Sequence, residues 1–285
     1  MSLPSHCDLV IRGGTVVDGS NGASWVGDVG ISGDRIVGTG DLSGASAARE
    51  VDATGRVVAP GFIDVHTHDD HLLIEGPDLA PKLSQGVTTV VTGNCGISLA
   101  PLWPGRQLPR DFGLLGDIDD QRFDRFGDYL DRLERMPAAV NAACLVGHTT
   151  LRVGSMDRLD RPANDREIAA MREALDDALD AGAVGMSSGL QYDSAFAAPL
   201  EEVIALVERL PQAGAIYATH IRNESDRVVE ALEEALATAR RAGARLLISH
   251  HKVAGPRNYG RSAETLAIID RARRHQRVAL DVYPY

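Results

Sequence analysis

The pattern of hydrophobic and polar positions changes near residue 60. Residues 1–59 contain short runs rich in β-branched residues, separated by Gly, Asp and Ser, and they show no helical periodicity. Runs of this kind predict strands joined by tight turns. We therefore expect residues 1–59 to form a small β domain, an antiparallel sheet of the β-sandwich type.

From residue 60 to residue 285, strand-like runs alternate with helical patterns. The clearest helical pattern is Glu224–Ala242, in which apolar residues recur on one face. Three predicted helices end in Ala-Gly, at Gly182, Gly214 and Gly243, and Gly readily ends a helix in the left-handed conformation. The predicted strands cover 62–66, 87–93, 142–147, 183–188, 215–220, 245–250 and 278–283.

The three helix ends repeat about every 30 residues, which is the length of one strand-helix unit. Such units in series form a parallel sheet, and eight of them close into a (β/α)8 barrel of the TIM type. We therefore assign residues 60–285 to the α/β class and to this barrel. Because only seven strands are predicted, we expect an incomplete barrel and a chain truncated at its C-terminal end. The segment 96–140, rich in Pro, Gly and Asp, predicts an active-site loop followed by a helix.

Five residues that can bind a metal ion lie at or just after the ends of predicted strands. They are His66, His68, Cys95, His220 and His250. Side chains two positions apart on a strand share a face, so the first two imidazoles can reach one ion. A thiolate beside imidazoles suits zinc. Each residue alone is more often structural, but their joint placement predicts a metal-dependent hydrolytic site.

Strand alternation leaves one of these assignments open. His250 and His251 are adjacent and therefore point to opposite faces, and the sequence does not indicate which of them faces inward. Asp69 and Asp70 are interpreted as loop residues or partners of the ligands rather than as ligands.

Polar residues near the predicted ligands are candidates for substrate binding. Lys252 follows His250 by two residues and could anchor a substrate carboxylate. Tyr192 and Tyr283 lie close to the predicted strand ends, and His148 at the end of the third strand could also touch substrate. Phosphate-binding loops, dinucleotide fingerprints and nucleophile elbows are not found.

Composition narrows the class of protein. The chain has 285 residues, 44% hydrophobic content and a net charge of −11, which argues against nucleic-acid binding through bulk charge. Its three scattered cysteines do not form a disulfide framework, which indicates a reducing compartment. No signal peptide or membrane-length apolar stretch is evident. We expect a cytoplasmic enzyme acting on a small molecule, and the sequence leaves the oligomeric state open.

Several motifs together are typical of one family. The segments APGFIDVHTHDD, GVTTVVTGNCGIS, SSGLQY, THIRNE, SHHK, NYGRS and DVYPY resemble those of the N-acyl-D-amino-acid deacylases (D-aminoacylases) of the amidohydrolase superfamily. The resemblance runs through nearly the whole chain. It implies a metal-bearing barrel, a small β domain built from both chain ends, and hydrolysis of the amide bond of N-acyl-D-amino acids.

The resemblance also implies roles for individual residues. Cys95, His220 and His250 match a tightly held zinc site, and His66 and His68 match a second, weakly held metal position. Tyr192, Lys252 and Tyr283 match positions that bind the carboxylate or carbonyl of the substrate. The predicted fourth strand, 183–188, lacks the bridging lysine of many relatives.

The chain departs from the family pattern at its end. The catalytic aspartate of the family lies on the eighth strand in a Ser-Asp-Gly sequence, and a later arginine helps to bind substrate. The 285 residues contain neither, so we expect no catalytic acid or base within them. A cyclic-amide hydrolase similar to hydantoinases or dihydroorotases, and a non-catalytic zinc-binding protein, are the alternative interpretations.

Overall fold

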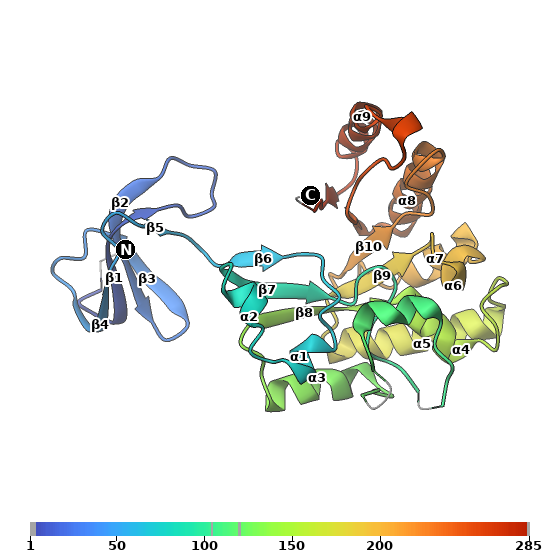
Figure 1. The fold of residues 1–285 in the computed structure, drawn as a ribbon, viewed down its shortest axis with the longest axis horizontal. Helices are drawn as coiled ribbons and strands as arrows, with labels where there is room; N and C mark the ends of the chain where they lie inside the picture. Colours follow the sequence, from blue (N-terminus) through green and yellow to red (C-terminus); the bar gives the residue numbers. More distant parts are fainter. Residues whose placement is uncertain (1–3, 104, 119–120, 284–285) are drawn as a thin grey trace. The chain divides into compact units, whose positions relative to one another are not determined.

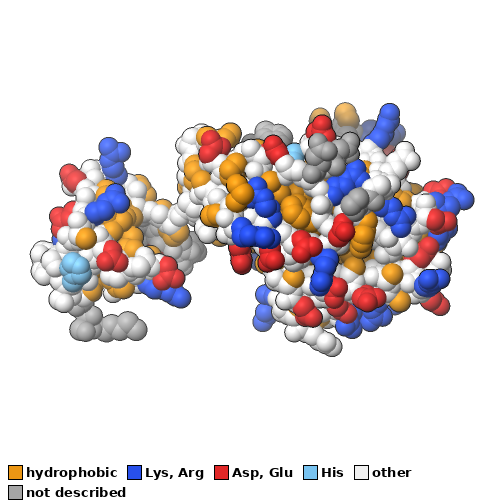
Figure 2. All heavy atoms as spheres, turned by 90° about the horizontal axis from the view of Figure 1, so that it is seen from below, with side chains coloured by type: hydrophobic (Ala, Val, Ile, Leu, Met, Phe, Trp, Pro, Cys, Tyr) orange, Lys and Arg blue, Asp and Glu red, His pale blue; other side chains and the backbone are white. Residues whose placement is uncertain are grey.

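The computed structural model describes residues 4–103, 105–118 and 121–283 (Figure 1). The chain divides into two compact units, Met1–Phe62 and Ile63–Tyr285. The first unit is a β-sheet, and the second alternates strands and helices. In the view of Figure 2, acidic and basic side chains are interspersed over the face of the larger unit.

The first unit is a five-stranded sheet. Its strands are β1 (His6–Val16), β2 (Trp25–Ser32), β3 (Arg35–Gly40), β4 (Ser46–Asp52) and β5 (Val57–Val58). The order is β3-β2-β1-β4, with β5 also paired to β1.

This sheet is mixed, which corrects the expectation of an antiparallel one. β1 pairs antiparallel with β2 but parallel with β4 and β5. Leu42 and Ala45, in the connection before β4, pack with Cys7 and Val10 in a small core. The connection therefore crosses from β3 to the other side of β1, and β4 runs in the same direction as β1.

The second unit is built on a parallel sheet of seven strands. They are β6 (Phe62–Asp64), β7 (Val87–Thr92), β8 (Asn141–Gly147), β9 (Gly185–Gly189), β10 (Ile216–His220), β11 (Arg245–Ile248) and β12 (Val278–Leu280). Each strand lies beside its neighbours in sequence, and the pairs from β7 to β12 are parallel. The curled arrangement confirms the predicted barrel class (Figure 1). Within the described residues the sheet ends at β6 and β12.

Helices follow the strands, as the sequence predicts. They are α1 (Leu72–Glu75), α2 (Ala80–Leu83), α3 (Phe126–Arg135), α4 (His148–Ser155), α5 (Asp165–Ala181), α6 (Asp193–Phe196), α7 (Leu200–Val207), α8 (Val228–Ala242) and α9 (Ser262–Ala272), with short 3-10 turns at Arg110–Leu115 and Pro256–Asn258. None of the helices in the described part of the chain could span a membrane.

The ends of these helices are specified locally. Asn164 and Glu167 form a reciprocal capping box at the start of α5, which satisfies free backbone N–H groups. Gly182 and Gly243 follow α5 and α8 in the left-handed conformation, as predicted. The predicted helix Glu224–Ala242 begins only at Val228. The side chain of Asn223 accepts hydrogen bonds from the backbone N–H groups of Ser225 and Arg227, which favours a turn there.

The main hydrophobic core lies between the sheet and the helices. Met171 and Leu175 of α5, Met186 of β9, Tyr217 of β10 and Leu232 of α8 are all fully buried in it. This packing fixes the parallel register, so the carboxyl ends of the strands meet at one edge of the sheet.

A buried ionic cluster joins α4 to α7. The side chains of His148, Arg152 and Glu202 are fully buried. Glu202 Oε1 accepts a hydrogen bond from His148 Nε2 at 3.1 Å and contacts Arg152 Nη1. Burial raises the pKa of Glu202, but the hydrogen bond from His148 and the charges of His148 and Arg152 outweigh it and lower that pKa to about 2.

We predict that Glu202→Gln lowers the free energy of unfolding by about 3–5 kcal/mol, because Arg152 would keep a buried charge without its partner. Since folding lowers the pKa of Glu202, its contribution is present above the unfolded pKa of about 4.3 and is lost as the pH falls through about 2. Urea denaturation at several pH values measures both effects.

The exposed pair of Arg158 and Asp160 provides the control for this measurement. Asp160→Asn should leave the urea midpoint nearly unchanged, because exposed ion pairs are screened by solvent. Equal effects of the two substitutions would contradict the role assigned to Glu202.

Candidate metal centre

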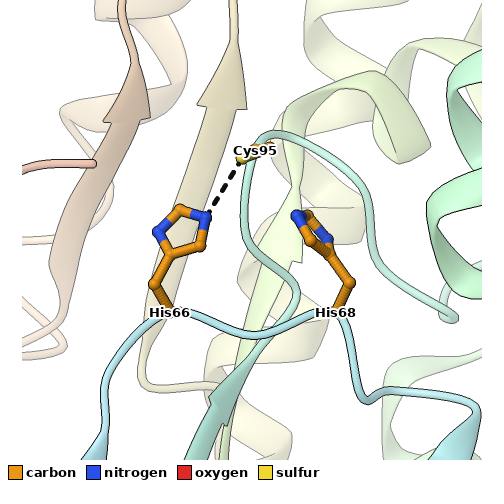
Figure 3. Close-up of side chains that lie close together, drawn as sticks. All are labelled: His66, His68 and Cys95. Atoms are coloured by element: carbon orange, nitrogen blue, oxygen red, sulfur yellow. Dashed lines mark hydrogen bonds between the residues drawn. The ribbon is translucent and has the colours of Figure 1, made fainter. Parts of the chain in front are cut away.

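The five predicted ligands meet at the carboxyl edge of the barrel sheet. His66 and His68 follow β6, Cys95 follows β7, His220 ends β10, and His250 follows β11. Among the described residues they form two sets, one of His66, His68 and Cys95 and one of Cys95, His220 and His250. Within each set, the donor atoms lie within 4.8 Å of one another. Figure 3 shows His66 and Cys95 facing each other, with His68 alongside.

Cys95 belongs to both sets and lies between them. Its Sγ is 3.3 Å from His66 Nε2 and 3.4 Å from His250 Nε2. Both Cys95 and His250 have positive φ angles, +55° and +35°. Such angles are uncommon outside glycine and mark positions where the surrounding structure holds the backbone in place.

The loop that carries Cys95 is fixed by its neighbours. The buried carboxylate of Asp70 accepts hydrogen bonds from Gly93 N at 3.0 Å and Leu99 N at 3.3 Å, on either side of Cys95. Gly189 of β9 lies against the loop, where a Cβ atom would be only 2.1 Å from the carbonyl oxygen of Cys95. Glycine at this position therefore lets the loop pack directly on the sheet.

The structure settles which histidine after β11 faces the donors. His250 Nε2 points to Cys95, whereas His251 Nε2 lies 3.0 Å from the hydroxyl of Thr265 in α9. The backbone N–H of His250 donates to Asp281 Oδ1 at 2.6 Å, which ties this residue to the end of β12.

The chemical state of these residues fits a metal ion. Burial lowers the pKa of His68 and of His220 to about 4, and for His220 it outweighs the charge of Glu224, which raises that pKa. Both imidazoles are therefore neutral at pH 7 and keep a lone pair. The buried Nδ1 atoms of His66, His68 and His220 have no hydrogen-bond partner among the described residues.

The thiol completes a donor set suited to zinc. Burial raises the pKa of Cys95 to about 12, so the thiol stays protonated until a cation displaces the proton. One sulfur and several imidazole nitrogens form a ligand set that zinc prefers in proteins.

The candidate substrate residues differ in placement. The ring of Tyr192 lies 4.9 Å from that of His220, and the ring of Tyr283 lies 6.3 Å from that of His250. Lys252 Nζ is 5.3 Å from the centre of the Tyr283 ring. These three residues therefore lie around the donor set of Cys95, His220 and His250. His148 begins α4, which turns its ring into the buried cluster with Glu202, so its contact with substrate stays a prediction without support from this placement.

Two buried acids beside the donors were not singled out from the sequence. Glu224 contacts His250 and Lys252, and Asp281 binds the backbone of His250. Glu224 follows His220 by four residues, and Asp281 directly follows the parallel strand β12, at the edge of the sheet where the ligands lie. These two positions could have identified the acids from the sequence. Glu224, however, lies within the predicted helix Glu224–Ala242, and Asp281 lies within the predicted strand 278–283.

Comparison with known proteins places these features in context. Residues 49–267 match the model of the "Amidohydrolase family". The chain is 53% identical over 278 residues to a D-aminoacylase and 53% identical over 283 residues to an N-acyl-D-aspartate deacylase, both of Alcaligenes xylosoxydans xylosoxydans. These alignments cover 98% and 99% of this chain but 57% of each relative. The chain thus spans little more than half the length of these curated relatives.

A solved structure gives the same picture of the fold. The N-acyl-D-glutamate deacylase from Bordetella bronchiseptica, complexed with zinc and a phosphonate inhibitor that mimics the tetrahedral intermediate, matches with a TM-score of 0.94 and 43% identity. The match covers 98% of this chain and 59% of that chain.

We predict that Cys95→Ala removes stoichiometric zinc from the purified chain, because this substitution takes a ligand from both donor sets. Inductively coupled plasma mass spectrometry after gel filtration measures the zinc content. Cys144→Ala is the matched control, because Cys144 is also a buried free thiol but belongs to the hydrophobic core. The control should keep its zinc, and unchanged zinc in Cys95→Ala would overturn the assignment.

Proposed function

Because this chain belongs to the amidohydrolase family, we propose that the protein carrying it is a zinc-dependent hydrolase of N-acyl-D-amino acids. The reaction would yield a carboxylate and a free D-amino acid. The observation that carries the proposal is the convergence of Cys95, His220 and His250 from three parallel strands onto one point. Zinc held there would polarise the amide carbonyl and lower the pKa of a bound water toward about 7.

The two donor sets would have different roles. We assign the tight zinc to Cys95, His220 and His250, whose side chains are all buried. His66 and His68 are half-buried and would share Cys95 in holding a second, weaker ion. Burial supports this ranking, because enclosed ligands are ordered before the metal binds and exposed ones lose more freedom.

Three side chains around the set of Cys95, His220 and His250 would bind substrate. Lys252 supplies an ammonium that would pair with the α-carboxylate of the N-acyl-D-amino acid. The Tyr283 hydroxyl would donate a hydrogen bond to the amide oxygen as negative charge develops on it. Tyr192, stacked near His220, would close the other side of the substrate. Holding the carboxylate and the carbonyl at separate points would fix the stereochemistry at the α-carbon.

Other chemistry of the family is less compatible with this chain. β9 (Gly185–Gly189) contains no lysine, whereas a bridging carboxylated lysine on this strand is expected for a cyclic-amide hydrolase. The proton acceptor expected in a Ser-Asp-Gly sequence is not among the 285 residues. The activity is therefore proposed for the complete protein. We further propose a cytoplasmic location, because Cys95 has to remain a free thiol and the other two cysteines are also unpaired.

A substrate panel tests the proposed reaction. We expect the complete protein, loaded with zinc, to hydrolyse N-acetyl derivatives of D-methionine, D-leucine, D-aspartate or D-glutamate, and to leave the L-enantiomers intact. Release of the free amino acid measured by chiral chromatography checks this prediction. Turnover of hydantoin or dihydroorotate instead would favour the cyclic-amide alternative, and bound zinc without any turnover would favour a non-catalytic protein.

We predict that Lys252→Ala raises KM for the N-acyl-D-amino acid by about tenfold to a hundredfold, because a hydrogen bond to a charged group contributes about 1.5–3 kcal/mol. Steady-state kinetics of the complete protein measure the change. The matched control is Lys82→Ala, which removes the only other lysine of the chain from its pairs with Asp64 and Asp69. Unchanged kinetic constants in Lys252→Ala would remove its proposed role.

A further inference from the structure

One buried carboxylate contacts both the candidate metal ligands and the proposed substrate anchor. Glu224 lies between β10 and α8 and is only 6% exposed. Its Oε1 is 2.9 Å from His250 Nδ1, and its Oε2 is 2.5 Å from Lys252 Nζ. The same Oε2 is 3.7 Å from His220 Nε2, which is too long for a hydrogen bond but close enough for electrostatic attraction. Glu224 therefore contacts a candidate metal ligand, His250, and the proposed substrate anchor, Lys252, through one carboxylate.

The chemistry of His250 selects Glu224 as its partner. His250 Nε2 faces the sulfur of Cys95, so this is the nitrogen available to a shared metal ion. A nitrogen that binds metal carries no proton, so the proton of the neutral ring lies on Nδ1. In the described part of the chain, Glu224 and Lys252 lie near Nδ1. The Glu224 carboxylate can accept its hydrogen bond, whereas the Lys252 ammonium at 3.2 Å is itself a donor.

The local backbone places the carboxylate there. α8 begins at Val228, so Glu224 lies outside the helix. The side chain of Asn223 holds the turn through Ser225 N and Arg227 N, each at 3.0 Å. The carbonyl of Glu224 accepts a hydrogen bond from Ala254 N at 2.6 Å, which joins this turn to the segment after Lys252.

Lys252 also fits a shared carboxylate. An ammonium has three donors. One binds Glu224 and a second reaches the carbonyl oxygen of His250 at 3.4 Å, which leaves the third for a substrate carboxylate. The chain has two lysines, Lys82 and Lys252, among 29 basic residues. A compact ammonium at this place differs from the planar fork that arginine would supply.

We infer that Glu224 is a positioning residue of the centre, whose carboxylate fixes the metal-binding tautomer of His250 and aims the ammonium of Lys252 at substrate. The inference rests on the proposed zinc site and deepens it, because it joins the metal ligands to the carboxylate anchor through one side chain. Partners of this kind usually change metal affinity by ten- to a hundredfold when they are removed.

Metal binding by the 285-residue chain tests the first half of this inference without any assay of activity. We expect the zinc dissociation constant, measured by competition with a chromophoric chelator, to rise about tenfold in Glu224→Gln and up to about a hundredfold in Glu224→Ala. The visible spectrum of the Co²⁺-loaded chain should change in both variants, because the orientation of His250 sets the ligand field. Gln keeps the shape of Glu, so this variant remains informative if Glu224→Ala does not fold.

Glu234→Gln is the matched control. Glu234 is a glutamate that is less buried than Glu224 and pairs with Arg222 at 2.7 Å, and among the described residues it belongs to neither donor set. Its substitution should leave the zinc dissociation constant and the Co²⁺ spectrum unchanged. Zinc affinity and spectrum equal to wild type in both Glu224 variants would overturn the inference, as would an equal loss in Glu234→Gln.

Kinetics of the complete protein test the second half. In Glu224→Gln at saturating zinc, we expect KM for the N-acyl-D-amino acid to rise severalfold, because Lys252 is no longer aimed. An unchanged KM would overturn the link to Lys252. Zinc affinity that depends on Glu224 in a protein without turnover would retain the metal role and reject the proposed reaction. Turnover by a protein whose zinc affinity does not depend on Glu224 would support the proposed reaction and reject the metal role of Glu224. A wild-type chain that binds no zinc would overturn both proposals.

Discussion

The parallel alignment of the barrel strands is the constraint on which the rest of the structure depends. Parallel strands bring all their carboxyl ends to one edge of the sheet. Residues from β6, β7, β10 and β11 therefore converge although they are up to 184 positions apart in sequence, from His66 to His250. The apolar packing of α5, α7 and α8 against the sheet maintains this alignment, so the hydrophobic core and the donor cluster are parts of one arrangement.

The donors gather at a cost that the surrounding structure has to offset. Cys95 and His250 adopt left-handed backbone angles, which typically cost about 1–3 kcal/mol each. Asp70, Asp281 and Glu224 stabilise these positions by hydrogen bonds to the loop backbone or to the imidazole. Burial keeps His68 and His220 neutral and the thiol of Cys95 protonated, so these side chains bring no charge of their own to the cluster and a cation can supply it.

The sequence predicted the features that repeat. The helix-ending glycines and the apolar strand runs predicted the barrel, and the ligand-type residues at strand ends predicted the donor cluster. Features set by long-range contacts were missed. The parallel pairing of β4 with β1 depends on packing around Leu42, and the choice between His250 and His251 depends on a backbone turn beyond β11, where strand alternation no longer holds. Glu224 was missed because the helical pattern of the sequence includes it. In the structure, hydrogen bonds from Ser225 N and Arg227 N to the side chain of Asn223 form a turn there instead of a helix.

The sharing of Cys95 between the two donor sets means that the two ions would not be independent ligands of the protein. Binding of each ion would alter the binding free energy of the other through the common sulfur. The two affinities would therefore be linked, and the two binding free energies would not be additive. Oxidation of this single sulfur to a sulfenic or sulfinic acid would weaken both positions together. A protein built in this way would carry its sensitivity to oxidants at the same atom that holds its metals.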